Sequence, residues 1–195
     1  MTVTKGMKLF LADKSIKKPK INIPENRYEF LSKFIGPSDN NDFITLDTWV
    51  KSSLVNTNSD LLLQMDIEGW EYLSIINASN DILKRFRIIV VEFHNLHELW
   101  NPSFFNIANQ TFSKLLETHS CVHIHPNNYS KLHIFNGIEI PPLAEFTFYR
   151  NDYNAMPDYE GNYPNILDSK NVEYNSDLNL PPIWYRSGFE KVIKS

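Results

Sequence analysis

The sequence predicts an α/β fold, and three observations support that class. Two short apolar runs, residues 61–65 and 88–91, have the length and composition of buried β-strands. Between them, apolar residues recur at the spacing of an amphipathic helix. A further helical segment and two more strand-like runs follow toward the C-terminus. Alternating strands and helices are typical of α/β proteins.

Length, composition and charge limit the classes of protein to consider. A chain of 195 residues is long enough for one domain with a sizeable core. Its hydrophobic fraction of 42% and aromatic fraction of 13% are typical of a globular protein. The net charge of -4 argues against nucleic-acid binding, which needs a basic surface. We therefore expect one folded unit with no nucleic-acid partner.

Neither a membrane span nor a signal peptide is evident. The chain has no run of about 18 apolar residues, and no apolar stretch of signal-peptide length follows residues 1–6. The single cysteine, Cys121, excludes a disulfide within the chain. These features predict a cytoplasmic protein.

The residues before position 60 predict one helix and little other regular structure. Residues 2–24 lack a periodic pattern, and two prolines there break any regular element. Residues 28–35 fit either a strand or a short helix, and turn-forming residues follow them. Either Thr45 or Asp47 can cap a helix that runs to about Leu54.

The middle of the chain predicts a strand, a helix and a second strand. Residues 61–65 are nearly all apolar, which favours a strand covered on both faces. Helix signals resume at Glu68 and are broken or restarted at residues 79–81. Residues 87–92 form the second buried-strand pattern.

The next segment predicts a third helix and two more strands. The helix covers residues 102–118 and begins with a proline, which the first turn of a helix tolerates. Strands follow at residues 121–125 and 144–149. The side chains expected on the inner face of the helix are Phe105, Ile107, Ala108, Phe112, Leu115 and Leu116.

Composition changes after position 150. Residues 151–182 are rich in Asn, Asp, Pro and Tyr and have no apolar stripe. We expect residues 151–195 to form an extended arm packed on the core, anchored by Ile183, Trp184 and Tyr185. The remaining chain then divides into an N-terminal extension, residues 1–27, and an α/β domain, residues 28–150.

Three acidic side chains, Asp66, Glu68 and Glu71, follow the first buried strand. Open α/β sheets bind ligands at the carboxyl ends of their strands. Gly69 permits a sharp turn, and we expect Glu68 and Glu71 in the first helical turn, where the helix dipole favours negative charge. A structural role, in the turn or at the start of the helix, is enough to explain each of these residues taken alone. Three crowded acids repel, however, so at least one carboxyl pKa should rise unless a cation or donor lies between them.

Glu92 and His94 end the second buried strand. Strand alternation places both on one side, with Phe93 opposite. A carboxylate beside an imidazole suits general-base catalysis, since the acid raises the basicity of the ring. Asp66, Glu92 and His94 equally suit a divalent metal, and a histidine hydrogen-bonded at a loop start needs neither role. We favour the base over the metal.

His123 and His125 share one face of a later strand at a spacing that zinc sites use. No third ligand is visible nearby, so we interpret them as a hydrogen-bonded strand end.

Several of these segments resemble the FkbM-type group of S-adenosylmethionine-dependent methyltransferases. The resemblance depends on residues 44–47, 62–71 and 89–94, and a subgroup of the family is also similar at residues 123–128 and 141–150. It covers roughly residues 28–150 and implies a Rossmann-like class I methyltransferase sheet. Family members typically O-methylate sugars or other small hydroxyl compounds.

The resemblance also implies roles for the candidate site. It places Asp66 near the bound S-adenosylmethionine and near the methyl acceptor. His94 or Glu92 would then act as the base. Asp66, Glu68 and Glu71 would bind the acceptor.

The donor-binding half of such a sheet is not evident. It requires a glycine-rich loop after the first strand, and the six glycines of this chain form no GxG pattern. Only 65 residues precede Asp66, whereas three β-α units need about 90. We therefore expect a sheet truncated at its N-terminal, donor-binding half, and the residues that bind the cofactor are unknown.

Three hypotheses for function follow. The chain is a partial or split O-methyltransferase, a non-catalytic remnant that binds a sugar or a protein, or a metal-dependent enzyme that uses Asp66, Glu92 and His94. Without a first strand, the edge of residues 61–66 is exposed and able to pair with another chain. We expect a homodimer or a complementing N-terminal half at that edge.

Overall fold

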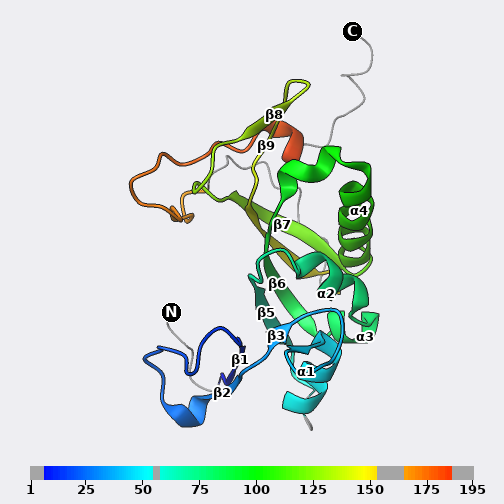
Figure 1. Ribbon diagram of the computed structural model, residues 1–195, viewed down its shortest axis with the longest axis vertical. Coiled ribbons are helices and arrows are strands. Elements are labelled where there is room, and N and C mark those ends of the chain that lie inside the picture. The colour runs from blue at the N-terminus through cyan, green and yellow to red at the C-terminus, as the bar shows by residue number, and fades with distance from the viewer. Residues whose placement is uncertain (1–6, 55–57, 153–164, 186–195) are drawn as a thin grey trace.

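A four-stranded mixed sheet lies at the centre of the structure, a computed structural model (Figure 1). Its order is β5 (Leu61–Met65), β6 (Phe86–Phe93), β10 (Ala144–Arg150) and β7 (His119–Pro126). β5 and β6 are parallel, and β10 is antiparallel to both β6 and β7. The expected α/β class is confirmed at this level, with a sheet of mixed direction.

The structure describes residues 7–54, 58–152 and 165–185. Among the helices in these ranges, none combines the length and the apolar character that crossing a bilayer requires.

Three helices cover one face of the sheet: α2 (Glu71–Asn77), α3 (Asn80–Leu83) and α4 (Pro102–Leu116) (Figure 1). The Ser79 side chain accepts a hydrogen bond from the backbone N–H of Ile82 and so begins α3, which confirms the restart expected there. The core lies between these helices and β6. Alternate β6 residues, Ile89, Val91 and Phe93, have no exposed surface.

The predicted helix near Thr45 is α1 (Leu46–Ser53). The Thr45 side chain accepts a hydrogen bond from the Thr48 backbone N–H, which identifies the cap that the sequence left open. Asp47 has another function. Its carboxylate accepts hydrogen bonds from the backbone N–H and the hydroxyl of Ser79, at 2.8 and 2.7 Å, and ties α1 to α3.

Two small sheets precede the central one. β1 (Leu9–Ala12) pairs in parallel with β2 (Tyr28–Leu31), and β3 (Phe34–Ile35) pairs in parallel with β4 (Phe43–Ile44). The expectation of no regular element before position 24 was wrong. β1 forms because a distant segment pairs with it, and local periodicity does not report such pairing.

A hairpin that the sequence analysis missed joins β7 to β10. It consists of β8 (His133–Phe135) and β9 (Ile138–Ile140). Asn136 and Gly137 connect the strands with φ angles of 49° and 77°. An Asn-Gly pair in the left-handed region is the strongest short-range hairpin signal.

β5 is not covered on both faces, contrary to expectation. Leu63 and Met65 are buried against the helices, whereas Leu62 is 49% exposed. Among the described residues β5 pairs only with β6, so it is an edge strand of the sheet. The homodimer or complementing half at this edge stays a prediction.

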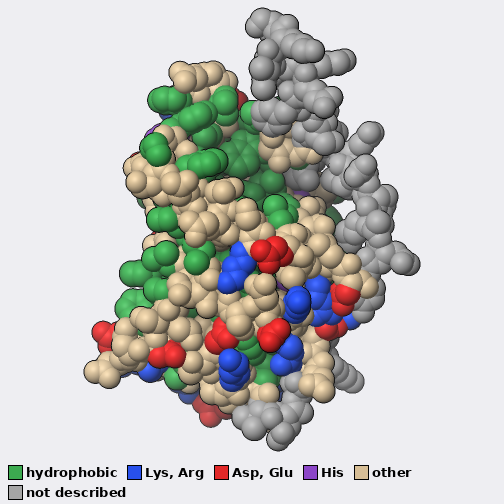
Figure 2. Space-filling model, turned by 90° about the vertical axis from the view of Figure 1, so that its right-hand side faces the viewer, with side chains coloured by type: hydrophobic (Ala, Val, Ile, Leu, Met, Phe, Trp, Pro, Cys, Tyr) green, Lys and Arg blue, Asp and Glu red, His purple; other side chains and the backbone are tan. Residues whose placement is uncertain are grey.

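The inner face of α4 also differs from expectation. Ala108, Thr111 and Leu115 are buried, at the i, i+3 and i+7 spacing of one helix stripe. Phe105 and Leu116 are instead 50% and 51% exposed. On the helical side of the molecule, apolar side chains gather in the upper half, and the charged ones lie below them (Figure 2).

The described part of the C-terminal arm, residues 165–185, contains one short helical turn, Pro182–Trp184. Trp184 packs near Phe146, with ring centroids 6.4 Å apart, and donates a hydrogen bond to the carbonyl of Glu139. Tyr185 also packs against the core, whereas Ile183 is 39% exposed and was wrongly expected to be an anchor. The proposed division of the chain into three parts stays a prediction.

Candidate functional site

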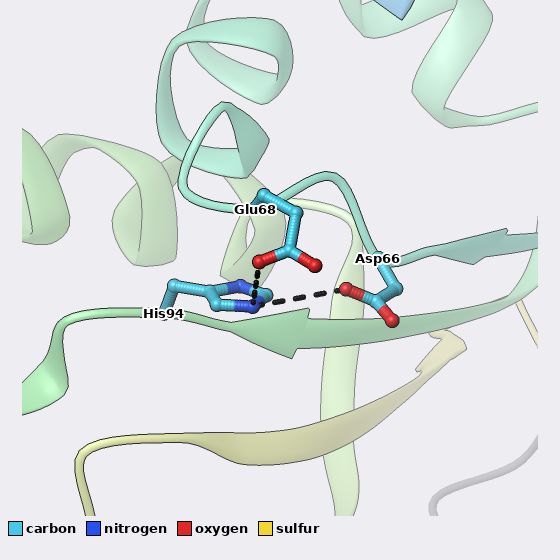
Figure 3. A group of neighbouring side chains, drawn as sticks. All are labelled: Asp66, Glu68 and His94. Atoms are coloured by element: carbon cyan, nitrogen blue, oxygen red, sulfur yellow. Dashed lines mark ion pairs between the residues drawn. The ribbon is translucent and has the colours of Figure 1, made fainter. Parts of the chain in front are cut away.

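The five candidate residues come together at the carboxyl ends of β5 and β6. Asp66 directly follows β5, and His94 directly follows β6. Because these two strands are parallel neighbours, their carboxyl ends meet at one edge of the sheet. Figure 3 shows the side chains of Asp66, Glu68 and His94 converging there.

A tight turn carries the chain from β5 into α2. Glu68 and Gly69 have φ angles of 57° and 99°, in the left-handed region. Gly69 therefore has the turn role expected of it. Glu68 lies in the turn and not in the first helical turn, which corrects the sequence-based expectation. Its carboxylate Oε2 lies 3.4 Å from Nε2 of His94.

Glu71 is the first residue of α2 and is completely buried. Its Oε1 accepts hydrogen bonds from the backbone N–H groups of Ile67 and Gly69, at 3.0 and 3.1 Å. The same oxygen lies 3.0 Å from Nδ1 of His94. Its Oε2 has no hydrogen-bond partner among the described residues. Because the Glu71 carboxylate can only accept a hydrogen bond, Nδ1 of His94 must be the donor and carry a proton.

His94 lies at the centre of the cluster, with a side chain that is 12% exposed. Its Nε2 faces carboxylates of Glu68, Asp66 and Glu92 at 3.4, 3.8 and 4.0 Å. The hydrogen bond to Glu71, aided by the charges of Glu71, Glu92 and Asp66, raises the pKa of His94 to about 9. The ring therefore carries a proton on each nitrogen at neutral pH.

Asp66 has a perturbed carboxyl group as well. Partial burial, followed by repulsion from Glu92, raises the pKa of Asp66. A carboxyl pKa is raised as expected, but the main cause differs: burial is the largest one, and the leading repulsion comes from Glu92, which was not one of the three crowded acids. Glu92 in turn accepts a hydrogen bond of 2.6 Å from the side-chain amide of Asn127.

Two residues that the sequence analysis did not assign to the site support it. The Tyr72 hydroxyl donates a hydrogen bond of 2.6 Å to the backbone carbonyl of His94. Asn127 holds the Glu92 carboxylate. Tyr72 lies in the segment that the sequence predicts as an amphipathic helix, and that pattern gives no indication of where the hydroxyl points. Asn127 lies in one of the segments on which the family resemblance depends.

The geometry favours a different metal-ligand set from the one expected. One ligand atom each from Asp66, Glu68 and His94 lies within 4.8 Å of the others. Glu92, the expected third ligand, is farther from His94 than Glu68 is.

His123 and His125 contact the C-terminal arm. Nε2 of His123 lies 2.8 Å from Oδ1 of Asp168, and Nε2 of His125 lies 3.7 Å from Oδ1 of Asp177. Within the described residues, neither histidine belongs to a group of three potential metal ligands. The interpretation as a hydrogen-bonded strand end holds for His123. It is wrong for His125, whose buried Nε2 has no hydrogen-bond partner among the described residues.

A shallow hollow lies at the other end of β10, lined by Lys84, Thr118, Arg150 and Asp152. Arg150 there forms ion pairs with Asp60 and Asp152, at 2.8 and 2.7 Å. Arg150 is thus neutralised by its two aspartates, so the acidic cluster around His94 remains the stronger candidate site.

Comparison with known proteins gives one match. The family model described as the methyltransferase FkbM domain matches residues 12–134, more than half of the chain. All five candidate residues lie within the matched range. No curated protein and no solved structure matches the chain.

Proposed function

Because the chain belongs to the FkbM methyltransferase domain family, we propose that it acts in the O-methylation of a small hydroxyl compound such as a sugar. One observation carries the proposal. Two segments of the matched range bring Asp66, Glu68, Glu71, Glu92 and His94 to the carboxyl ends of adjacent parallel strands. Ligands of open α/β sheets bind at such an edge.

S-adenosylmethionine is the proposed methyl donor, but the described residues do not fit it. Gly69 is the only described glycine that follows a strand of the central sheet, and its N–H already bonds to Glu71. No described glycine-rich turn is open to a nucleoside. We therefore assign the donor to a complementing chain, and the residues described here to the acceptor side.

The acceptor-side chemistry follows from the protonation of the site. An acceptor hydroxyl that gains a methyl group must lose its proton to a nearby base. Since His94 is already protonated at neutral pH, the carboxylates of Asp66 and Glu92 are better placed to receive that proton. Asp66 has a raised pKa, which makes it a stronger base than an ordinary aspartate.

His94 then acts as a hydrogen-bond donor. A protonated ring stabilises the negative charge that develops on the acceptor oxygen. Glu71 positions the ring through Nδ1, and Tyr72 holds the backbone at His94. This assignment moves the base from His94 to the carboxylates, one of which, Glu92, was a candidate base from the sequence.

The test is a methyl-transfer assay with isotopically labelled S-adenosylmethionine and a panel of sugars and hydroxy acids. The expected product carries one added methyl group in mass spectrometry. Asp66→Asn and Glu92→Gln should each lower the rate by about 100-fold or more, the usual contribution of a general base. Asp81→Asn, an exposed aspartate on α3, is the matched control.

Two results would contradict the proposal. One is product formation at the wild-type rate by both site variants. The other is a folded wild-type chain that neither forms product nor binds any member of the panel in ligand-observed NMR. Calorimetry with S-adenosylmethionine and S-adenosylhomocysteine separately tests whether this chain holds the donor.

A further inference from the structure

We propose that Glu145 and His125 form a second subsite for the methyl acceptor, and that this subsite selects an amino sugar. The inference rests on the proposed function and deepens it, because it specifies the class of acceptor. The subsite would hold groups of the sugar other than the hydroxyl that receives the methyl group. Neither residue is among the five candidate residues, and three observations point to them.

The first observation is a row of polar side chains across three strands. Glu145 of β10 lies directly opposite Glu92 of β6 and also directly opposite His125 of β7. Its neighbours Ala144 and Phe146 are buried on the face that the helices cover. Because successive side chains of a strand point to opposite faces, the row lies on the other face of the sheet. It continues the candidate site, since Glu92 belongs to both.

The spacing of the row suits a ligand with several polar groups. Neighbouring strands of a sheet lie about 4.8 Å apart, which sets the separation between one member of the row and the next. A sugar ring carries hydroxyl or amino groups on several of its carbons. A ring bound at Glu92 through one group can therefore reach Glu145 with another, whereas a compound with a single hydroxyl cannot.

The second observation is the uncompensated charge of Glu145. Its side chain is partly exposed and forms no hydrogen bond or ion pair with another described residue. Like charges directly opposite each other in a sheet are destabilising, and the residue opposite Glu145 on β6 is Glu92. A ligand ammonium group would relieve this repulsion, whereas a carboxylate or phosphate would add to it. The charge therefore favours an amino sugar over an acidic one.

The third observation is the buried imidazole of His125, which is independent of the acids. Its side chain is 9% exposed, and Nε2 has no hydrogen-bond partner among the described residues. Oδ1 of Asp177, on the C-terminal arm, lies 3.7 Å from Nε2, which is too far for a direct hydrogen bond.

A sugar hydroxyl would satisfy the His125 ring. One oxygen can lie within hydrogen-bond distance of both His125 Nε2 and Asp177 Oδ1, donating to the carboxylate and accepting from the ring. The Asp177 side chain is 25% exposed, so a small movement of it would admit the hydroxyl. Pairing a buried polar group that lacks a partner is favourable. The row thus offers a carboxylate to an ammonium group and, one strand farther, an imidazole to a hydroxyl.

The experiment measures how glucosamine, glucose and glucuronate bind to the full chain, by ligand-observed NMR below neutral pH and without a methyl donor. The wild-type chain should bind glucosamine most tightly and glucuronate least. Glu145→Gln keeps the size of the side chain and removes its charge. It should weaken glucosamine binding by about 10-fold and change glucose binding by less than about 3-fold.

Two further variants complete the binding experiment. Glu139→Gln is the matched control, because Glu139 is an exposed glutamate on β9, the strand that precedes β10. It should leave the binding of all three sugars unchanged. His125→Gln should weaken the binding of glucosamine and glucose alike. Because Glu145 is partly exposed, Glu145→Gln is expected to fold even if His125→Gln does not.

A methyl-transfer assay separates this inference from the proposed function. Glu145→Gln should raise KM for glucosamine and leave kcat near the wild-type value, whereas loss of a catalytic base lowers kcat. Equal wild-type binding of the three sugars, or equal glucosamine affinity in Glu145→Gln and Glu139→Gln, overturns the subsite and leaves the methyl-transfer proposal standing. A folded chain that binds none of the three sugars also overturns it, even if that chain methylates another hydroxyl compound.

Discussion

Replacing Glu71 by glutamine should lower the pKa of His94 and remove a pH-dependent contribution to stability. Glutamine keeps an oxygen that can accept the hydrogen bonds from Ile67 and Gly69, but it removes the charge facing the ring. The hydrogen bond to Glu71 is the largest cause of the raised pKa of His94. Without it, the pKa should return toward 6.5, the ordinary value for histidine.

The magnitude follows from the shift from 6.5 to about 9. At 1.36 kcal/mol per pKa unit, the folded state favours the protonated ring by about 3 kcal/mol more than the unfolded state does. Because the folded pKa is the higher one, this stabilisation is fully present below about pH 6.5. It declines as the pH rises and is lost above about pH 9. The stability gap between wild type and Glu71→Gln should shrink over the same interval.

Two measurements on the metal-free chain check this prediction. NMR titration of the His94 ring reports the pKa directly, and urea unfolding at several pH values reports the free energy of unfolding. Glu68→Gln is the control, because Glu68 is not among the main causes of the shift. A wild-type His94 that titrates near 6.5, or equal pKa changes in the two variants, would refute the reasoning.

Two further predictions concern the core and the C-terminal arm. Ile75→Val should lower the free energy of unfolding by about 0.5–1.5 kcal/mol, because Ile75 has no exposed surface. Ile134→Val is the control and should change that free energy little, because Ile134 is 69% exposed. Chemical denaturation of both variants measures the difference. Asn128→Ala should speed hydrogen exchange at Val172, because the buried Asn128 amide both donates to and accepts from the Val172 backbone, at 2.9 and 2.8 Å. Unchanged exchange there would mean that other contacts hold the arm.

The sequence predicted those elements whose structure depends on a short stretch of neighbouring residues. The apolar runs at β5 and β6, the cap at Thr45 and the restart at Ser79 each depend on a few neighbouring residues. β1 could not be predicted in the same way, because it exists through pairing with β2. Strand propensity depends on such partners more than helix propensity does.

Burial was the harder property to predict from pattern. Leu62 lies in an apolar run, yet it is 49% exposed because helices cover only one face of β5. Phe105 and Leu116 lie on an apolar helix but on its outer side. An apolar residue type shows that a side chain would gain free energy from burial. Whether it is buried depends on which helices and strands pack over it.

The same distinction holds at the site. Spacing along two strands was enough to predict that Asp66, Glu92 and His94 would lie close together, since parallel neighbours end at one edge. It could not show that Glu71 turns inward to hold Nδ1 while Glu68 stays exposed. That difference depends on the left-handed turn at Glu68 and Gly69.

The site also gathers features that oppose stability. Glu68 adopts a left-handed backbone without being glycine, and Asn95, directly after His94, does so as well. Glu71 buries a carboxylate with one oxygen unpartnered among the described residues. Strained backbone and unsatisfied buried polar groups cost about 1–3 kcal/mol each. They persist where the surrounding structure holds them and where function needs the geometry. That Glu68, Glu71 and Asn95 all lie beside His94 is a physical reason, separate from the family match, to propose that the function of this chain is located there.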